Sequence, residues 1–296
     1  MKWQEKDLDI YKDGRMNIFE EKKIKISEAV LALDLDGTLT NSKKEITENT
    51  KAAIDKFIKA GGTVVLASGR PTFGVSPIAN ILEFEKKGGY ILSYNGGYFY
   101  DCKNDKELFM KELTHEYLPI LEEQAKRFGV NLMTYNHDKA YALDIDEQYY
   151  MLEVTINHFI RVKVDPLAPQ ITFPIIKCLM TAPGDHLAKV EQEMKKLWEG
   201  KLNIVRSEPY FLELTEVGID KANTLLNMTK KIGKDTKNLV CCGDGFNDLS
   251  MIQAAGIGVA MANAQEKVRQ AADYITKSND EDGIEDVIEK LFYWDR

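Results

Sequence analysis

The 296-residue sequence lacks the features of a membrane, secreted or nucleic-acid-binding protein. It has no run of 18 apolar residues, so we expect no membrane-spanning helix. Residues 1–25 are polar and of mixed charge, without the apolar stretch of a signal peptide. The formal net charge of −8 disfavours general binding to nucleic acid, because contacts with phosphates require a basic surface. The sequence also has no internal repeat and no low-complexity tract.

Cysteine is scarce, and none of the four cysteines has the spacing of a metal site such as C-x-x-C. Cys241 and Cys242 are adjacent in an apolar run, so we expect them on opposite faces of a strand, where they cannot pair comfortably. We therefore expect reduced, buried thiols and a cytoplasmic location.

What the sequence does contain is a regular alternation of strand-like and helix-like segments. Between the apolar runs lie stretches with helical spacing; one begins after Thr47, which can cap a helix, and ends at Gly61-Gly62. Strands joined through helices form right-handed parallel units. The pattern predicts an α/β fold built on a doubly wound parallel sheet. The predicted strands are 30–33, 63–67, 90–94, 239–242, 257–261 and 274–276.

The texture of the sequence changes between the two groups of strands. Aromatic segments with alternating polarity, such as 141–145, mix there with two amphipathic helices at about 118–128 and 187–197. This change predicts an inserted α+β domain. We expect the chain to leave the core through Asn95-Gly96-Gly97, because a hinge needs permissive backbone. The predicted units are a core at 28–96 and 210–296, an inserted domain at 97–209, and an N-terminal extension of unknown role at 1–27.

Asp34-Leu35-Asp36-Gly37-Thr38 directly follows the first predicted strand and carries most of the functional information. Side chains two residues apart in an extended segment lie on the same side, so Asp34 and Asp36 reach one point. In open α/β sheets ligands bind at this point, the carboxyl end of a central strand. Two carboxylates so close need a cation or a shared proton. A plain acidic turn is the alternative interpretation, since Asp-Gly is a common turn pair.

Two further segments offer groups that suit an anion. Ser68-Gly69-Arg70-Pro71 combines a hydroxyl, a glycine that lets the backbone approach an anion, and a proline suited to the start of a helix. Lys221 opens a helix after Asp220, where a lysine opposes the helix dipole unless it has an anionic partner. Taken alone, these features are also typical of an ordinary strand-to-helix turn and of a solvated surface lysine.

A third loop, Gly243-Asp244-Gly245-Phe246-Asn247-Asp248, follows another apolar strand and supplies two carboxylates and a carboxamide. Oxygen-rich groups of this kind suit Mg²⁺, which prefers octahedral oxygen ligation. Because this loop and the Asp34–Asp36 pair both follow parallel strands, we predict a magnesium site where they meet.

Taken in order, these motifs resemble those of the haloacid dehalogenase superfamily, and the long insertion between the second and third motifs resembles its C2B cap class. The resemblance implies a Rossmannoid core with an inserted α+β cap. It covers about residues 29–292 and is weaker inside the cap. Several further stretches are similar to the Cof-type sugar-phosphate phosphatases, close to the YidA-like group; they are 94–97, 209–214, 258–264 and 276–283.

The resemblance implies a role for each motif residue. Asp34 would be the nucleophile that forms an aspartyl-phosphate, and Asp36 would protonate the leaving alcohol and then activate water. Mg²⁺ would be held by Asp34, the backbone carbonyl of Asp36, and Asp244, with Asp248 as a further or outer ligand. The groups that would bind the phosphate are Ser68, Lys221, Asn247 and the backbone of Leu35 and Gly69.

The acid role of Asp36 requires that this carboxyl be protonated when substrate arrives. Its carboxylate neighbours would favour the proton, whereas Mg²⁺ and Lys221 would oppose it. Departures from the family pattern are few: Ser68 replaces the commoner threonine, and Ala222 stands where glycine often follows the lysine.

The function that this resemblance implies is a Mg²⁺-dependent phosphatase of small phosphorylated metabolites, with sugar phosphates as the expected class. A phosphotransferase of the phosphomannomutase type can share this cap class and stays open as an alternative. A catalytically silent protein that binds metabolites in the same pocket is a third interpretation. We expect no nucleic-acid or membrane partner, and a monomer or small homo-oligomer.

Specificity is expected from the cap, which in such enzymes closes over the core and excludes water. The candidates are polar and aromatic residues of the cap: Tyr135, His137, Tyr141, Tyr149, Tyr150 and Lys177. For each, packing in the core of a small domain is the competing interpretation, and His137 is expected to be exposed in a turn.

Overall fold

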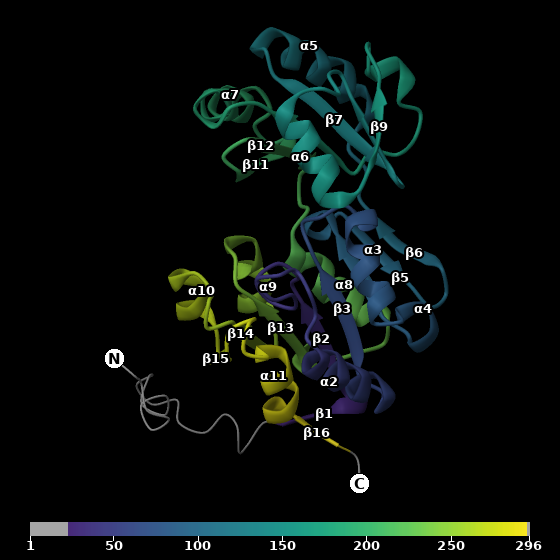
Figure 1. Ribbon diagram of the computed structural model, residues 1–296, viewed down its shortest axis with the longest axis vertical. Helices are drawn as coiled ribbons and strands as arrows, with labels where there is room; N and C mark the ends of the chain where they lie inside the picture. The colour runs from purple at the N-terminus through teal and green to yellow at the C-terminus, as the bar shows by residue number, and fades with distance from the viewer. Residues whose placement is uncertain (1–22, 295–296) are drawn as a thin grey trace.

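The computed structural model describes residues 23–294, which form two large sheets that lie one above the other in Figure 1. The core sheet has eight strands in the order β15-β14-β13-β2-β3-β4-β5-β6. Neighbours from β15 to β4 are parallel, and β5 and β6 extend the sheet in antiparallel fashion. Its strands are β2 (Val30–Leu33), β3 (Thr63–Ala67), β4 (Tyr90–Ser93), β5 (Tyr98–Asp101), β6 (Lys106–Met110), β13 (Leu239–Gly243), β14 (Ile257–Ala260) and β15 (Tyr274–Ile275).

Helices cover both faces of the core sheet, which confirms the predicted doubly wound architecture. Phe57 of α2 packs on one face with apolar residues of α3 and α11, and Leu225 of α8 packs on the other. As expected, Thr47 caps α2 by accepting a hydrogen bond from the Thr50 amide, and Cys241 and Cys242 belong to opposite faces. The helices of this layer are α2 (Glu48–Lys59), α3 (Thr72–Ile81), α4 (Phe84–Lys87), α8 (Lys221–Lys231), α9 (Leu249–Ala254), α10 (Glu266–Ala271) and α11 (Gly283–Leu291).

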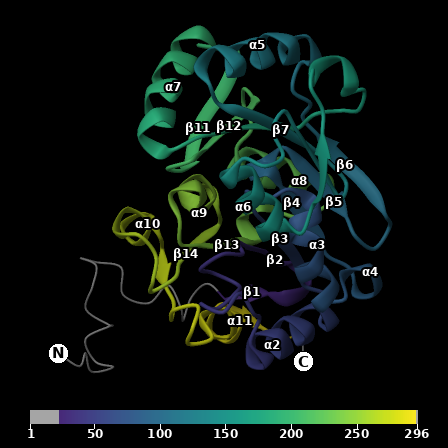
Figure 2. The ribbon, with the colours of Figure 1, turned by 45° about the horizontal axis from the view of Figure 1, so that its top comes forward.

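The cap sheet has six strands in the order β11-β12-β10-β7-β8-β9 and is antiparallel except where β8 meets β9. Helices α5 and α7 pack on its outer face, and α6 lies on the face toward the core sheet (Figures 1 and 2). Its elements are β7 (Asn131–Asn136), β8 (Lys139–Ala142), β9 (Ile160–Lys163), β10 (Lys177–Thr181), β11 (Leu202–Glu208), β12 (Phe211–Glu216), α5 (Leu118–Phe128), α6 (Gln148–Asn157) and α7 (Gly184–Leu197).

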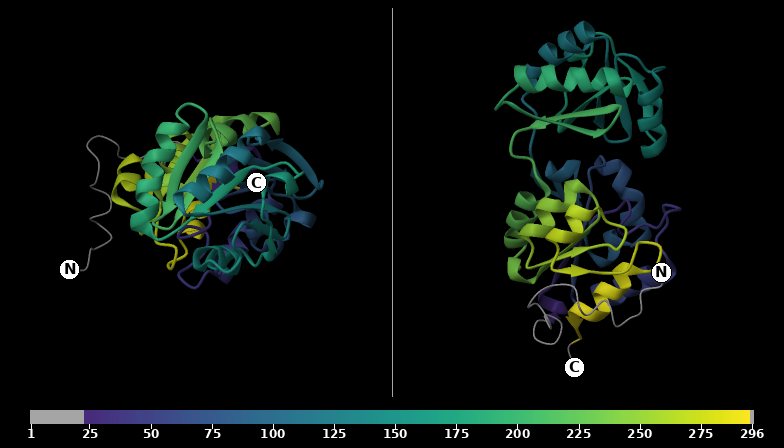
Figure 3. Two further views of the ribbon diagram at one scale, coloured as in Figure 1. Left: turned by 90° about the horizontal axis from the view of Figure 1, so that it is seen from above. Right: turned by 90° about the vertical axis from the view of Figure 1, so that its left-hand side faces the viewer.

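Two chain segments, 111–117 and 217–220, connect the two sheets, and Figure 3 shows the two layers from the side. The sheets therefore divide the chain differently from the predicted ranges. Strands β5 and β6 fall inside the predicted insertion at 97–209 but pair with β4, whereas β12 follows residue 209 but pairs with β10. We infer a cap of about residues 112–217.

The predicted exit hinge at Asn95-Gly96-Gly97 is wrong. This segment is a 3-10 turn (Tyr94–Gly96) that connects β4 to β5 within the core sheet. Its glycine is required by close approach, because Gly96 has φ +104° and an added Cβ would lie 2.6 Å from the Asp220 carbonyl oxygen. The turn packs against the start of α8, which is where Lys221 lies.

A short parallel pair joins the two ends of the described chain. Strand β1 (Ile24–Lys25) pairs with β16 (Phe292–Tyr293), and Ile26 is buried with Phe292 in the core. The described part of the predicted N-terminal extension therefore belongs to the core layer; residues 1–22 lie outside the described residues. Between residues 23 and 294, no helix is long and apolar enough to cross a membrane.

Candidate active site

The sequence motifs converge at the carboxyl ends of β13, β2 and β3, which are neighbours in the core sheet. In this register Cys242 lies beside Leu33, and Leu33 beside Leu66, so the loops that follow the three strands start at the same edge. Strand β2 leads into Asp34, β3 into Ser68, and β13 into Asp244. The sequence prediction that these segments meet is therefore correct in space.

Lys221 lies at the centre of the site with its side chain fully buried. Its Nζ donates hydrogen bonds to Asp34 Oδ1 at 2.7 Å, to Asp248 Oδ1 at 2.6 Å and to the Ala67 carbonyl oxygen at 3.0 Å. Burial lowers the pKa of this lysine, but the charges and hydrogen bonds of Asp248 and Asp34 outweigh burial and raise it. The two carboxylates are thus the anionic partners that a lysine at a helix start requires.

Three carboxylates crowd around this single ammonium. One oxygen from each of Asp34, Asp244 and Asp248 lies within 4.8 Å of the others. Burial, followed by the charge of Asp248, raises the pKa of Asp34 well above its usual value. Burial likewise raises the pKa of Asp244 to about 6. The residues fit a divalent cation, because the donors are all carboxylate oxygens and three carboxylates share the single ammonium of Lys221.

Asp248 is fully occupied within the protein. Its Oδ2 accepts hydrogen bonds from the backbone N–H groups of Asp244 at 3.1 Å and Gly245 at 2.9 Å. Its Oδ1 accepts a hydrogen bond from Lys221 Nζ. The side chain therefore fixes both the loop after β13 and the lysine. This arrangement suits the role of an outer ligand better than that of a direct one.

Gly37 allows the first loop to approach the third. It has φ +82°, and an added Cβ would lie 2.5 Å from Asp244 Oδ2, so both backbone and space require glycine. The adjacent Thr38 donates its hydroxyl hydrogen bond to Asp244 Oδ1 at 2.9 Å. These two residues hold the Asp244 carboxylate beside Asp34.

Asp36 forms an ion pair that the sequence did not reveal. Arg70 donates from Nε to Oδ2 at 2.8 Å and from Nη2 to Oδ1 at 2.7 Å, and Lys44 Nζ donates to Oδ1 at 2.8 Å. Burial raises the pKa of Asp36, but the hydrogen bonds and charges of Arg70 and Lys44 lower it overall. Arg70 and Lys44 are therefore the cations that disfavour protonation of Asp36. The sequence predicts this effect for Lys221, and the structure corrects that prediction.

The predicted phosphate-binding groups border the same point. Ser68 is buried, and its Oγ accepts a hydrogen bond from the Arg70 amide at 3.1 Å. Asn247 is more exposed, and its Nδ2 donates to Asn95 Oδ1 at 3.5 Å. Leu35 and Gly69 belong to the loops after β2 and β3, which start at the same edge of the core sheet.

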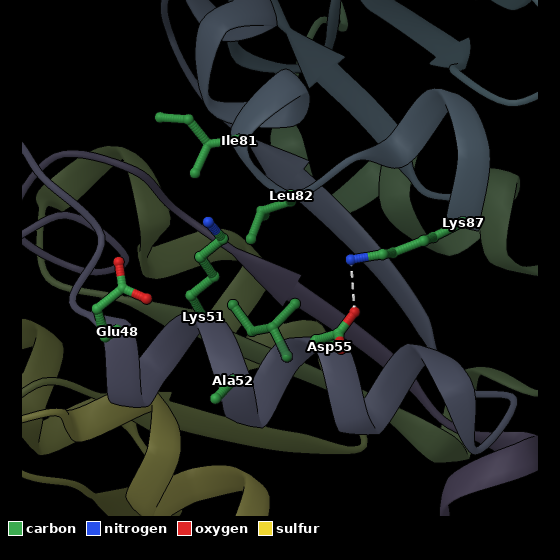
Figure 4. A pocket seen from close by; sticks show the side chains of 8 residues that line it. Glu48, Lys51, Ala52, Asp55, Ile81, Leu82 and Lys87 are labelled. Carbon is green, nitrogen blue, oxygen red and sulfur yellow. Dashed lines mark ion pairs between the residues drawn. The ribbon is translucent and has the colours of Figure 1, made fainter.

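A cavity of about 230 Å³ opens between this site and the cap. Lys221 and Asn247 line its core side, and Glu213 lines its cap side. A separate cavity of about 190 Å³ between α2 and the α3–α4 segment holds none of the motif residues (Figure 4). Within it Lys87 Nζ lies 2.6 Å from Asp55 Oδ1, so these two charges compensate each other.

The cap residues proposed for specificity do not line the 230 Å³ cavity. Tyr150 is buried and donates its hydroxyl to the Ala140 carbonyl, Tyr141 packs against Phe173 on the outer face, and His137 is exposed in a turn. Tyr149 stacks on Tyr210. For Tyr150 and Tyr141, packing within the cap is therefore the better interpretation than contact with a substrate.

Lys177 contacts Glu213 of the cavity lining, and its Nζ lies 5.8 Å from the centre of the Tyr135 ring. Lys177 Nζ donates to Glu213 Oε1 at 3.0 Å and to the Gly69 carbonyl at 3.4 Å, so it links the cap to the phosphate-side loop. Tyr135 donates its hydroxyl to Glu153 Oε1 at 2.9 Å. Glu213 itself was missed, because an alternating strand sequence does not reveal which of its polar residues faces a cleft in another domain.

Comparison with known proteins identifies a family over most of the chain. Residues 31–288 match the family model described as haloacid dehalogenase-like hydrolase. The chain is 30% identical to YxeH of Bacillus subtilis, over 88% of this chain and 97% of that protein. It is 28% identical to the 5-amino-6-(5-phospho-D-ribitylamino)uracil phosphatase YcsE of the same organism, over 86% and 92%. The crystal structure of a haloacid dehalogenase-like hydrolase from Bacteroides thetaiotaomicron matches with a TM-score of 0.86 and 42% identity, over 89% and 99%.

Proposed function

Because the chain belongs to the haloacid dehalogenase-like hydrolase family, we propose that it is a Mg²⁺-dependent phosphatase that hydrolyses small phosphorylated metabolites through an aspartyl-phosphate on Asp34. Phosphate esters of sugars or sugar alcohols are the proposed substrates. The relative YcsE, named as a phosphatase of a phosphoribityl compound, supports this class. A cytoplasmic location and the oligomeric state stay predictions from the sequence.

The observation that carries the proposal is the contact of Asp34 with Lys221 inside the group of three carboxylates. Lys221 holds the Asp34 carboxylate in one orientation and places a positive charge beside the position of a transferring phosphoryl group. Mg²⁺ held by Asp34, Asp244 and the Asp36 carbonyl would neutralise charge on the phosphoryl oxygens. The crowding of carboxylates at rest supports that need for a cation.

The proposed chemistry has two steps on Asp34. Attack of its carboxylate oxygen on phosphorus forms an acyl phosphate, and the bond between phosphorus and the ester oxygen breaks. Asp36 gives its proton to the departing oxygen, which leaves as the alcohol. Asp36 then takes a proton from water as the water oxygen attacks phosphorus, and the Asp34–phosphorus bond breaks to release phosphate.

This role of Asp36 requires a change at its ion pair. Bound to Arg70 and Lys44, which lower its pKa, Asp36 is ionised and has no proton to give. We propose that Asp36 leaves Arg70 and becomes protonated when substrate and cap enclose the site.

The experiment that tests the function is phosphate release from a panel of phosphorylated metabolites with Mg²⁺. Asp34→Asn should abolish turnover, because an amide cannot form the acyl phosphate, and Asp36→Asn should lower it by about a hundredfold or more. Glu289→Gln, which neutralises an exposed carboxylate on α11, serves as the matched control and should leave turnover unchanged.

Three outcomes would overturn the proposal. Full turnover by pure, folded Asp34→Asn protein would remove the nucleophile. Conversion of a hexose 1-phosphate to its 6-phosphate isomer without free phosphate would identify a phosphotransferase of the phosphomannomutase type. Absence of phosphate release from every substrate, with Mg²⁺ binding intact, would identify a silent binding protein.

A further inference from the structure

Phe246 is exposed although it lies in the middle of the catalytic loop. Its side chain is 59% exposed, and no other large apolar residue between 23 and 294 is more exposed. The residues on either side are polar or small, and Asn247 and Asp248 belong to the site. A single exposed aromatic residue is ordinary on a protein surface, so its surroundings decide whether it has a role.

The surroundings of Phe246 are the cavity between core and cap. Phe246 lines its core side, and Val205 on β11, itself 47% exposed, lines its cap side. Lys221 and Asn247, which border the phosphate position, line the same cavity. A molecule whose phosphate occupies that position therefore extends its alcohol portion between two apolar side chains from opposite domains.

The charges of the cavity lining favour a neutral alcohol portion. Lys221 is committed to Asp34 and Asp248, and the other charged residues of the lining, Glu213 and Asp220, are acidic. A second phosphate or a carboxylate on the substrate would find no free cation in the lining. Hydroxyl groups, in contrast, can donate to Glu213, whose carboxylate accepts hydrogen bonds from Lys177 Nζ and Asn95 Nδ2 and has further lone pairs.

The size of the cavity limits the alcohol portion further. About 230 Å³ is below the range of about 300–1,000 Å³ typical of pockets for drug-sized ligands. This volume suits a single sugar ring better than a nucleoside with its separate base and ribose.

We propose that Phe246 is a specificity-determining residue that packs, opposite Val205, on the carbon skeleton of a neutral cyclic sugar. This inference rests on the proposed phosphatase function and deepens it, because it assigns selection of the leaving group to the catalytic loop of the core as well as to the cap. The apolar C–H face of the ring lies on Phe246, and the ring hydroxyls turn toward Glu213 and Asn203.

The test compares two substrates in one phosphate-release assay with Mg²⁺: glucose 6-phosphate, which carries a ring, and glycerol 3-phosphate, which does not. In Phe246→Ala the ratio of kcat/KM for glucose 6-phosphate to that for glycerol 3-phosphate should fall about tenfold, chiefly through KM. Phe246→Tyr should restore the ratio, because the ring returns. Ile160→Ala removes another exposed apolar side chain, outside the cavity, and should not change the ratio.

Four results would overturn the assignment. An unchanged ratio in Phe246→Ala would mean that the ring does not contact the sugar. An equal fall in both substrates would mean that Phe246 supports the loop or the closure of the cap. If the wild-type protein releases phosphate from p-nitrophenyl phosphate but prefers glycerol 3-phosphate to glucose 6-phosphate, the phosphatase function stands and the ring-binding proposal fails. If it releases phosphate from no substrate, both fail.

Discussion

The core and the cap meet at the cavity with buried charges, but they balance those charges differently. On the core side three carboxylates surround one ammonium, that of Lys221. On the cap side Lys177 pairs with Glu213, and the extra carboxyl, Glu153, binds the Tyr135 hydroxyl. Burial raises the pKa of Glu153, and its neighbours only partly oppose this. The charged groups on the cap side thus find partners among cap side chains. The core side has an excess of negative charge that a bound cation would neutralise.

Among the substitutions that test this contrast, Lys221→Met should have the largest effect. The change removes the one cation of the carboxylate cluster, so the attacking carboxylate loses both its orientation and its electrostatic support. Phosphate release should fall by about a thousandfold or more. Lys230→Met, which removes an exposed lysine near the end of the same helix, should retain full activity. Activity within tenfold of wild type would show that the core does not depend on this ammonium.

The ion pair of Lys177 with Glu213 in the cap should contribute to the free energy of unfolding. Lys177→Met leaves Glu213 without its ammonium partner and should lower the free energy of unfolding by about 3 kcal/mol. The double variant Lys177→Met/Glu213→Leu removes both charges and should recover most of that loss. Urea unfolding of the two variants and of wild type measures the difference. Equal losses in the single and double variants would contradict the picture of a closed pair.

In the absence of metal, Asp244→Asn should stabilise the fold, whereas Lys177→Met destabilises it. The folded pKa of Asp244, about 6, lies above the usual value of a free aspartate, about 4, so its charge destabilises the fold above pH 6. That penalty is relieved as the pH falls from 6 toward 4. The variant should therefore be more stable than wild type at pH 7, by about 2–4 °C in Tm, and equal to it near pH 4.

Mg²⁺ should reverse the order of these two proteins at pH 7. Saturating Mg²⁺ should raise the Tm of wild type, because a ligand that binds only the folded state stabilises it, and should raise that of Asp244→Asn much less. Thermal unfolding with EDTA and with Mg²⁺, at pH 7 and near pH 4, gives all four comparisons. A metal-free variant less stable than wild type at pH 7 would mean that the carboxylates do not repel one another.

Much of the core could be predicted because its rules are local. Apolar runs of four or five residues became strands, Thr47 and Asp220 became helix caps, and the loops that follow adjacent parallel strands had to share one edge. Lys221 was recognisable because a lysine at a helix start needs an anion. These inferences need only the covalent order of the chain.

The parts that failed depend on distant contacts. The two hydrogen bonds from Arg70 to Asp36 join residues 34 positions apart. Nothing in Ser68-Gly69-Arg70 indicates which carboxylate the arginine binds. The antiparallel hairpin of β5 and β6 could not be assigned to the core sheet, because alternation does not reveal which sheet a strand joins. The same limit hid Glu213 and Val205 in the cap strands.

The short pairing of β1 with β16 has a consequence for the covalent topology of the molecule. It holds Ile24 beside Phe292 and Lys25 beside Tyr293, on the core layer and away from the cap in Figure 1. Residues near these positions can be joined by a short linker, and the chain can be opened instead at the exposed turn around His137. Such a circular permutant keeps every strand order described here, yet makes the former insertion the place where the polypeptide begins and ends.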